Sequence, residues 1–300
     1  RSYYSLSQTM DLVQKMKNGE LTSDDVIFYE DMFTPGLECL PYIMDQSPPE
    51  YRPKVFVRFL AQTTDPDDFL IREGMFEWMR KYEQMLDKFV SGICVASEEF
   101  VAHLRIAGFK APIYVTGLPY GKSEVQERVP ELKTLITRSR RVGFAARWDD
   151  EKQPHFYMDL AEAYYKVDPN TEFAIFCGHP ELKSNDQEYV DRAMALQEGN
   201  TANFKVYTGL KKNDYYNYLA DSQVLFNCAL QDWVSNTVSE ADTMGTLTLY
   251  PAYRSFPEVF ANNGNHLYVP WSIEDAKDKL TKMFNSIDNN DLSSYNIGKI

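Results

Sequence analysis

The chain has 300 residues, of which 44% are hydrophobic and 14% aromatic, and this is enough for two ordinary domains that each bury a core. Its 44 acidic and 31 basic residues give a net charge of -13, which argues against a large basic surface for nucleic acid. No apolar run approaches the ~18 residues of a membrane span, and the first residues do not form a signal peptide, so we expect a soluble protein.

The cysteines are far apart and lack the C-x-x-C spacing of zinc and redox sites; they are Cys39, Cys94, Cys177 and Cys228. Most of them fall within apolar, strand-like runs. We therefore expect buried free thiols rather than disulfides or zinc ligands, which favours a reducing, cytoplasmic location.

Helical and strand-like segments alternate along the chain, which is typical of an α/β protein whose parallel sheets are covered by helices. In the first half we expect helices over 5–17, 69–89 and from Ser97 to a stop at Gly108, and strands over 25–29, 54–60, 92–96 and 113–115. These elements predict one Rossmann-like domain over residues 1–118. The Gly-Leu-Pro-Tyr-Gly segment and the charged stretch after it predict a linker over 119–140.

The same alternation resumes after the linker and predicts a second Rossmann-like domain over residues 141–300. We expect strands over 141–146, 172–177, 204–207, 224–227 and 247–249, and helices over 154–167, 190–196, 213–220, 237–244 and 272–284.

Two carboxylates eight positions apart, Asp232 and Glu240, mark the most informative segment of the second half. A small-residue helix ending at Gly245 follows them, and a Pro-Glu pair lies downstream at 257–258. A loop that leads into a helix offers free N–H groups and a positive dipole end to an anion, and a carboxylate accepts two neighbouring hydroxyls such as those of ribose. Alone, the spacing also fits a turn cap at Asp232 and a solvated Glu240.

A second informative segment begins at Gly143 in a predicted strand and continues to Arg147 and, after four intervening residues, Lys152. Two fixed cations can stabilise the charge that grows on a nucleoside diphosphate when a glycosyl–phosphate bond breaks. The alternative is that both cations pair with nearby acids at 149–151 on the surface.

Together the two segments resemble the signature of family 4-like retaining glycosyltransferases of GT-B fold, and the resemblance extends from Arg141 to Phe260. It implies that Arg147 and Lys152 contact the donor diphosphate, that Asp232 faces the transferred sugar and that Glu240 holds the ribose. The remaining donor-binding positions that it implies are Gly143, Gly178, His179, Ser235, Asn236 and Thr237. The sequence differs from the family in having Asp232 in place of a glutamate, and Trp233 and Ser235 in place of glycines.

The first half resembles the end of the family's acceptor domain, through 92–99 and 113–119. The usual opening of that domain, a strand and a glycine-rich loop, has no counterpart after Arg1, so we expect this domain to be incomplete or abbreviated.

Four further features are interpreted as structural or left open. Asp65-Pro66-Asp67 has the D-x-D form of a metal motif but is better explained as a helix start, so no metal site is expected. His103 is expected to be half-buried and structural, and the tyrosines at 215–218 are expected to pack on the sheet. His179 fits either a donor contact or a plain loop residue.

The sequence thus predicts a cytoplasmic hexosyltransferase that needs no cofactor and no metal. It would move a sugar from a UDP-, GDP- or other nucleotide sugar, with the retention of configuration that the resemblance implies. The acceptor, whether glycan, small molecule or modified DNA, is not specified. Two alternatives stay open: a phage-type enzyme that glycosylates a hydroxymethylated pyrimidine in DNA, and a non-catalytic module that binds sugar nucleotides.

Overall fold

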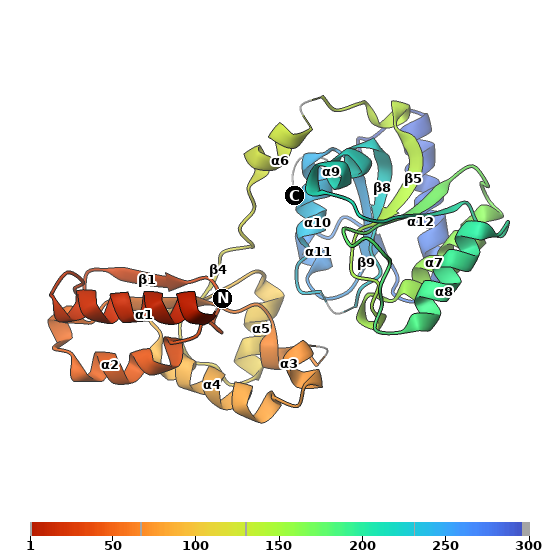
Figure 1. Cartoon of the computed structure of the whole chain (residues 1–300). Helices are drawn as coiled ribbons and strands as arrows, with labels where there is room; N and C mark the ends of the chain where they lie inside the picture. The colour runs from red at the N-terminus through yellow and green to blue at the C-terminus, as the bar shows by residue number, and fades with distance from the viewer. Residues whose placement is uncertain (1, 67, 130, 231, 296–300) are drawn as a thin grey trace. The chain divides into compact units, whose positions relative to one another are not determined.

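The computed structural model describes residues 2–66, 68–129, 131–230 and 232–295. The chain divides into two compact units, Arg1–Leu118 and Pro119–Ile300 (Figure 1). Both units contain a parallel sheet with helices, so the predicted α/β class is confirmed. None of the helices in the described part of the chain has the length and apolar composition needed to cross a bilayer.

The first unit contains a four-stranded parallel sheet in the order β1-β2-β3-β4. Its strands are β1 (Val26–Tyr29), β2 (Lys54–Arg58), β3 (Gly92–Val95) and β4 (Ile113–Val115). Its α-helices are α1 (Ser2–Lys17), α2 (Leu40–Gln46), α3 (Phe69–Arg72), α4 (Phe76–Phe89) and α5 (Glu98–Ile106), with short 3-10 turns η1 (Leu37–Cys39), η2 (Pro49–Tyr51) and η3 (Gln62–Thr64). The order does not reverse among these described strands, so right-handed crossovers place the connecting helices on one face.

One helix prediction in this unit is wrong, because the segment expected as a single helix over 69–89 is interrupted at Gly74. Gly74 has a left-handed φ of 75°. Its N–H donates to the carbonyl of Ile71 at 3.0 Å, and the N–H of Met75 donates to the carbonyl of Leu70 at 2.9 Å. This pair of bonds is a Schellman end, which terminates α3 before α4 begins. The expected start and stop of α5 are confirmed, since Ser97 accepts from the N–H of Phe100 and Gly108 has a φ of 92°.

The second unit contains a six-stranded parallel sheet in the order β10-β9-β8-β5-β6-β7. Its strands are β5 (Ser139–Phe144), β6 (Glu172–Phe176), β7 (Phe204–Tyr207), β8 (Ser222–Phe226), β9 (Leu247–Pro251) and β10 (Leu267–Tyr268). The chain runs outward from β5 through β6 to β7 and then returns to place β8 on the other side of β5. This is the strand order of dinucleotide-binding sheets, in which ligands bind outside the carboxyl ends of the strands where the order reverses. That point lies here between β5 and β8.

The helices of this unit lie where the sequence predicts helices, apart from shifts at their ends and additional elements. They are α6 (Lys122–Arg128), α7 (Pro154–Tyr165), α8 (Gln187–Glu198), α9 (Lys212–Asp221), α10 (Asn236–Thr243), α11 (Phe256–Val259) and α12 (Ile273–Asp288), with 3-10 turns η4 (Leu135–Thr137) and η5 (Asp150–Lys152). Helix α6, the short α11 and strand β10 were not anticipated.

The segment 119–140, expected as a linker, is packed onto the second unit. Val125 of α6 is buried together with Leu219 and Met244. Arg138 is also buried, and its guanidinium donates to the carbonyl of Met244 at 2.8 Å and to Thr246 Oγ1 at 3.0 Å. Burial of an apolar side chain and satisfaction of a buried cation therefore fix this segment, although its charged composition is that of an exposed linker.

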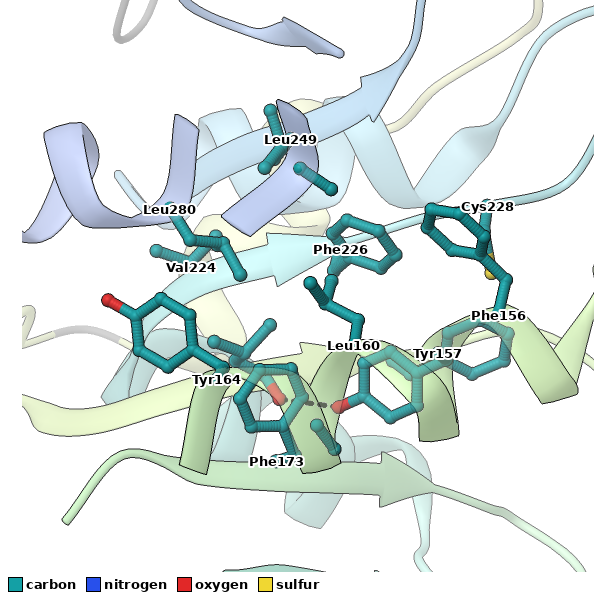
Figure 2. Close-up of a cluster of buried hydrophobic side chains, with 14 of the residues drawn as sticks. Phe156, Tyr157, Leu160, Tyr164, Phe173, Val224, Phe226, Cys228, Leu249 and Leu280 are labelled. Atoms are coloured by element: carbon teal, nitrogen blue, oxygen red, sulfur yellow. Dashed lines mark hydrogen bonds between the residues drawn. The ribbon is translucent and has the colours of Figure 1, made fainter. Parts of the chain in front are cut away.

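An aromatic core joins α7 to the sheet and determines where the loop before α7 lies (Figure 2). Phe156 stacks on Phe226 of β8 with 6.2 Å between ring centroids. Tyr157 is fully buried, and its hydroxyl donates to the carbonyl of Val142 at 2.7 Å and accepts from the N–H of Ala174 at 2.9 Å. Because these hydroxyl bonds reach both β5 and β6, α7 and the residues just before it are held at the carboxyl edge of the sheet.

Candidate functional site

Lys152 and Asp232 meet at the reversal point of the strand order. Lys152 ends η5 in the loop after β5, Asp232 lies in the loop after β8, and the ammonium of Lys152 donates to the carboxylate of Asp232. The thiol of Cys228, just past β8, also donates to the backbone carbonyls of Lys152 and Gln153 at 3.3 Å. The structure thus joins two predicted catalytic residues that are 80 positions apart in the sequence.

The Lys152–Asp232 pair is largely removed from water, with side-chain exposures of 9% and 19%. Withdrawing a charge from water costs several kcal/mol unless a partner compensates it, so each side chain holds the other in place. A ligand that reaches this edge meets a hydrogen-bond donor and an acceptor side by side. Such a pair can bind a sugar hydroxyl on the acid and an anionic oxygen on the ammonium.

Arg147 lies on the same loop but has different partners. Its guanidinium is 61% exposed and bonds to Glu151 at 2.6 Å, with Asp149 at 3.6 Å. This is the local surface pairing that the sequence left open as an alternative to phosphate binding. Lys152, in contrast, pairs with Asp232 in the loop after β8.

The start of α10 carries the predicted anion-binding positions 235–237. Ser235 is the N-cap residue, but its side chain makes no capping bond to the helix. Its hydroxyl instead bonds to Thr237 Oγ1 at 2.6 Å, and Thr237 Oγ1 bonds to the hydroxyl of Tyr250 at 2.8 Å. Burial raises the pKa of Tyr250, so its hydroxyl keeps its proton. A helix start whose cap side chain is engaged elsewhere favours an anion as the partner of its first N–H groups.

Glu240 is buried in α10, so the solvated helix face considered for it is excluded. Its Oε1 accepts from Lys212 at 2.8 Å and from Tyr216 at 2.9 Å, and its Oε2 accepts from Tyr215 at 2.6 Å. Burial alone would lower the pKa of Lys212, but the hydrogen bond to Glu240 holds it above its ordinary value. The hydroxyls of a ribose would have to displace one of these donors, and Lys212, at 57% exposure, is the most exposed of them.

The predicted glycines and His179 have local structural roles in this state. A Cβ on Gly143 would lie 2.6 Å from the ring of Phe176, so packing between β5 and β6 requires glycine there. A Cβ on Gly178 would lie 3.4 Å from a backbone carbonyl. His179 is exposed, and its Nδ1 lies 3.0 Å from the carbonyl and 3.2 Å from the N–H of Glu181. Their contacts with a donor stay predictions.

The remaining candidates from the sequence are placed as follows. Asp65 is buried and Asp67 lies outside the described residues; within the described ranges no three His, Cys, Asp or Glu side chains converge as a metal ion would require. His103 is half-exposed and lies 3.4 Å from Glu99 on α5. Tyr218 packs on Tyr207 with 4.4 Å between ring centroids, as predicted.

All four cysteines are free, but only two of them are buried. Cys94 and Cys228 are buried, Cys177 is partly exposed and Cys39 is exposed. The expectation of free thiols holds, and the expectation of burial fails at Cys39 because it lies at the junction of η1 and α2 rather than in a strand.

Three further residues of this region were not anticipated from the sequence: Lys212, Tyr250 and Arg254, whose guanidinium lies over the ring of Trp233 next to Asp232. Tyr215 packs against Phe176 of β6 as expected, with 6.4 Å between ring centroids, and its hydroxyl also donates to Glu240, which was not expected. The signal for Tyr250 was its position at the end of a predicted apolar strand, where a phenol hydroxyl needs a buried partner. No sequence signal pointed to the contact of Lys212 with Glu240 or to that of Arg254 with Trp233, since these two partners lie on other elements.

Comparison with known proteins identifies the fold. No protein-family model and no curated protein matches the sequence. The structure of TarM matches with a TM-score of 0.65 and 13% identity, over 95% of this chain and 52% of that one. Pneumococcal O-GlcNAc transferase GtfA, solved with UDP and GlcNAc, matches with a TM-score of 0.60 and 14% identity, over 96% and 56%.

Sucrose-phosphate synthase from Thermosynechococcus elongatus also matches, with a TM-score of 0.66 and 11% identity, over 98% of this chain and 73% of that one. The chain spans about half the length of TarM and GtfA. Identities this low establish the fold and not the activity. The chain therefore has the GT-B fold of these glycosyltransferases, as the resemblance in its sequence predicts.

Proposed function

We propose that this protein is a glycosyltransferase whose nucleotide-sugar donor binds at the carboxyl edge of the second sheet. The observation that carries the proposal is the pairing of Lys152 and Asp232 at the reversal point between β5 and β8, next to the start of α10. Donor and acceptor groups for a sugar, and an uncapped helix start for a phosphate, are what a nucleotide sugar needs. Similar structures that contain UDP, those of GtfA and a Staphylococcus aureus TarM mutant, favour a UDP-sugar.

In the proposed reaction the bond between the sugar C1 and the phosphate oxygen breaks, and its electron pair goes to the diphosphate. Lys152 and the first N–H groups of α10 stabilise the charge that develops there. Asp232 accepts a hydroxyl of the transferred sugar. The acceptor oxygen bonds to C1 on the same face, and its proton goes to the departing phosphate oxygen, so configuration is retained without a separate base.

Glu240 would hold the ribose in this proposal. Because Lys212 already occupies Oε1, binding exchanges this exposed ammonium for a ribose hydroxyl while Tyr215 and Tyr216 stay in place. The released Lys212 adds a cation near the donor. The buried Glu240 carboxylate stays hydrogen-bonded through the exchange, because a ribose hydroxyl takes the place of the ammonium as donor.

A thermal-shift panel of UDP, GDP, ADP and TDP sugars tests the proposal first. A ligand at ~100 times its dissociation constant stabilises the folded state by about 2.7 kcal/mol. Hydrolysis of the stabilising donor is then compared in the wild type, in Asp232→Asn and in the matched control Asp278→Asn, an exposed acid on α12. Loss of hydrolysis in Asp232→Asn alone supports the proposal.

The alternatives are distinct outcomes of the same experiments. A shift without hydrolysis by the full-length protein identifies a non-catalytic binding module. A salt-sensitive gel shift with hydroxymethylated DNA identifies the DNA-modifying enzyme, against which the charge of -13 argues. The proposed function is refuted if no sugar nucleotide gives a thermal shift and none is hydrolysed.

A further inference from the structure

Arg254 occupies an unfavourable backbone conformation in the loop between β9 and α11. Its φ is 52°, in the left-handed region where side chains are disfavoured and glycine is the usual residue. It is the first central residue of a turn in which the N–H of Phe256 bonds to the carbonyl of Tyr253 at 3.2 Å. Strained residues of this kind cluster at binding sites, where the side chain is needed in one place.

The guanidinium of Arg254 is held in position but is incompletely paired. Its carbon lies 4.6 Å from the centroid of the Trp233 ring and 5.4 Å from that of Tyr253. Its Nε is buried without a hydrogen-bond partner, and within the described residues no carboxylate forms an ion pair with it. A buried donor without a partner is energetically unfavourable. A ligand that accepts a hydrogen bond from this guanidinium would remove that cost.

The position of Arg254 connects it to the candidate site. Its ring partner Trp233 directly follows Asp232, the partner of Lys152, and β9 is the neighbour of β8 in the sheet. The other cations named at this edge are already matched by acids: Lys152 by Asp232, Arg147 by Glu151, and Lys212 by Glu240. Arg254 therefore supplies a positive charge that no carboxylate within the described residues pairs with.

We propose that Arg254 is a binding residue for the diphosphate of the donor. This inference rests on the proposed function, because it names a further contact at the same site. A guanidinium presents N–H donors in a plane that matches two phosphate oxygens, and stacking on Trp233 holds that plane in one orientation. A bound phosphate would supply the hydrogen-bond acceptor that this guanidinium lacks, and its binding would explain why the strained turn is kept.

Calorimetric titration with inorganic pyrophosphate tests the inference without requiring the correct sugar or base. The variants are Arg254→Gly, which relieves the backbone strain and removes the cation, and Arg254→Lys, which keeps the charge without the planar donors. Ala261→Gly is the matched control, since Ala261 is exposed with a φ of 49° and carries only a methyl group. Thermal midpoints are measured for all four proteins.

We expect pyrophosphate to bind about tenfold or more weakly to Arg254→Gly, with a smaller loss in Arg254→Lys and none in Ala261→Gly. The thermal midpoint of Arg254→Gly should stay close to that of the wild type, because relief of strain offsets the lost stacking. Unchanged pyrophosphate affinity, with or without a lower midpoint, overturns the inference and leaves Arg254 a structural residue. If Arg254→Gly does not fold, the comparison with Arg254→Lys decides.

Failure of the inference can be distinguished from failure of the proposed function. Donor hydrolysis that proceeds equally in the wild type and Arg254→Gly, with equal pyrophosphate affinity, refutes only the role of Arg254. Pyrophosphate binding that depends on Arg254, without hydrolysis of any sugar nucleotide, supports the anion site and refutes the enzyme. A wild-type protein that binds no pyrophosphate at millimolar concentration contradicts the inference directly.

Discussion

Replacing Lys152 with alanine is expected to affect catalysis and stability by separate mechanisms. The ammonium should stabilise charge that appears only as the glycosyl–phosphate bond breaks, so its loss should lower kcat more than donor affinity. By analogy with one oxyanion-stabilising donor, the cost is ~2.7–4 kcal/mol, or about 10²–10³ in rate. The same change leaves Asp232 without its cation. Because Asp232 is 19% exposed, we expect ~1–3 kcal/mol of lost stability rather than the ~3–5 of a fully buried pair.

Donor hydrolysis, calorimetric donor affinity and thermal midpoints measured on the same preparations separate the two effects. For a domain of this size each kcal/mol shifts the midpoint by roughly 2–4 °C. Adding Asp232→Asn to Lys152→Ala removes the unpaired charge, so it should recover stability without recovering turnover. Lys282→Ala is the control, because Lys282 is an exposed lysine on α12 that pairs with Asp278 one turn away on the same helix. Normal kcat with a raised KM in Lys152→Ala would refute the catalytic assignment.

Three further predictions concern binding, metal and pH. Glu240→Gln should weaken UDP binding by ~1.5–3 kcal/mol in calorimetry, the range for hydrogen bonds to a charged group, and unchanged affinity would contradict the ribose assignment. EDTA should leave turnover unchanged, because Lys152 rather than a divalent ion is expected to face the diphosphate; a loss that manganese restores would contradict this. Burial lowers the pKa of His266 below its ordinary 6.5, so the unfolded chain takes up a proton more readily. The free energy of unfolding should therefore fall as pH drops below about 6.5, and urea titrations of His266→Asn should show a smaller fall than the wild type.

Secondary structure followed largely from local patterns. The period of apolar residues identified the described strands of both sheets except β10, and Ser97 and Gly108 marked the ends of α5 because caps act within one turn of chain. The prediction over 69–89 failed, since an apolar period continued across Gly74 while the backbone there ended the helix. Segment 119–140, predicted as a linker from its charges, contains Val125, whose burial depends on partners more than 90 positions away.

The sequence alone predicted the α/β class and, through its resemblance to a known family, the GT-B fold. It also singled out two carboxylates and two cations as candidate site residues. Only the tertiary structure decided which of these groups meet. Lys152 pairs with Asp232 because β8 lies beside β5 in the sheet, whereas Arg147 pairs with Glu151 of its own loop. The spacing of these residues along the chain does not predict which partner each cation takes. Likewise, the left-handed φ of Arg254 and its contact with Trp233 are features of the structure that no pattern in the sequence predicted. Charges interact through space, so their partners depend on strand order, whereas helix caps and apolar periods act along the chain.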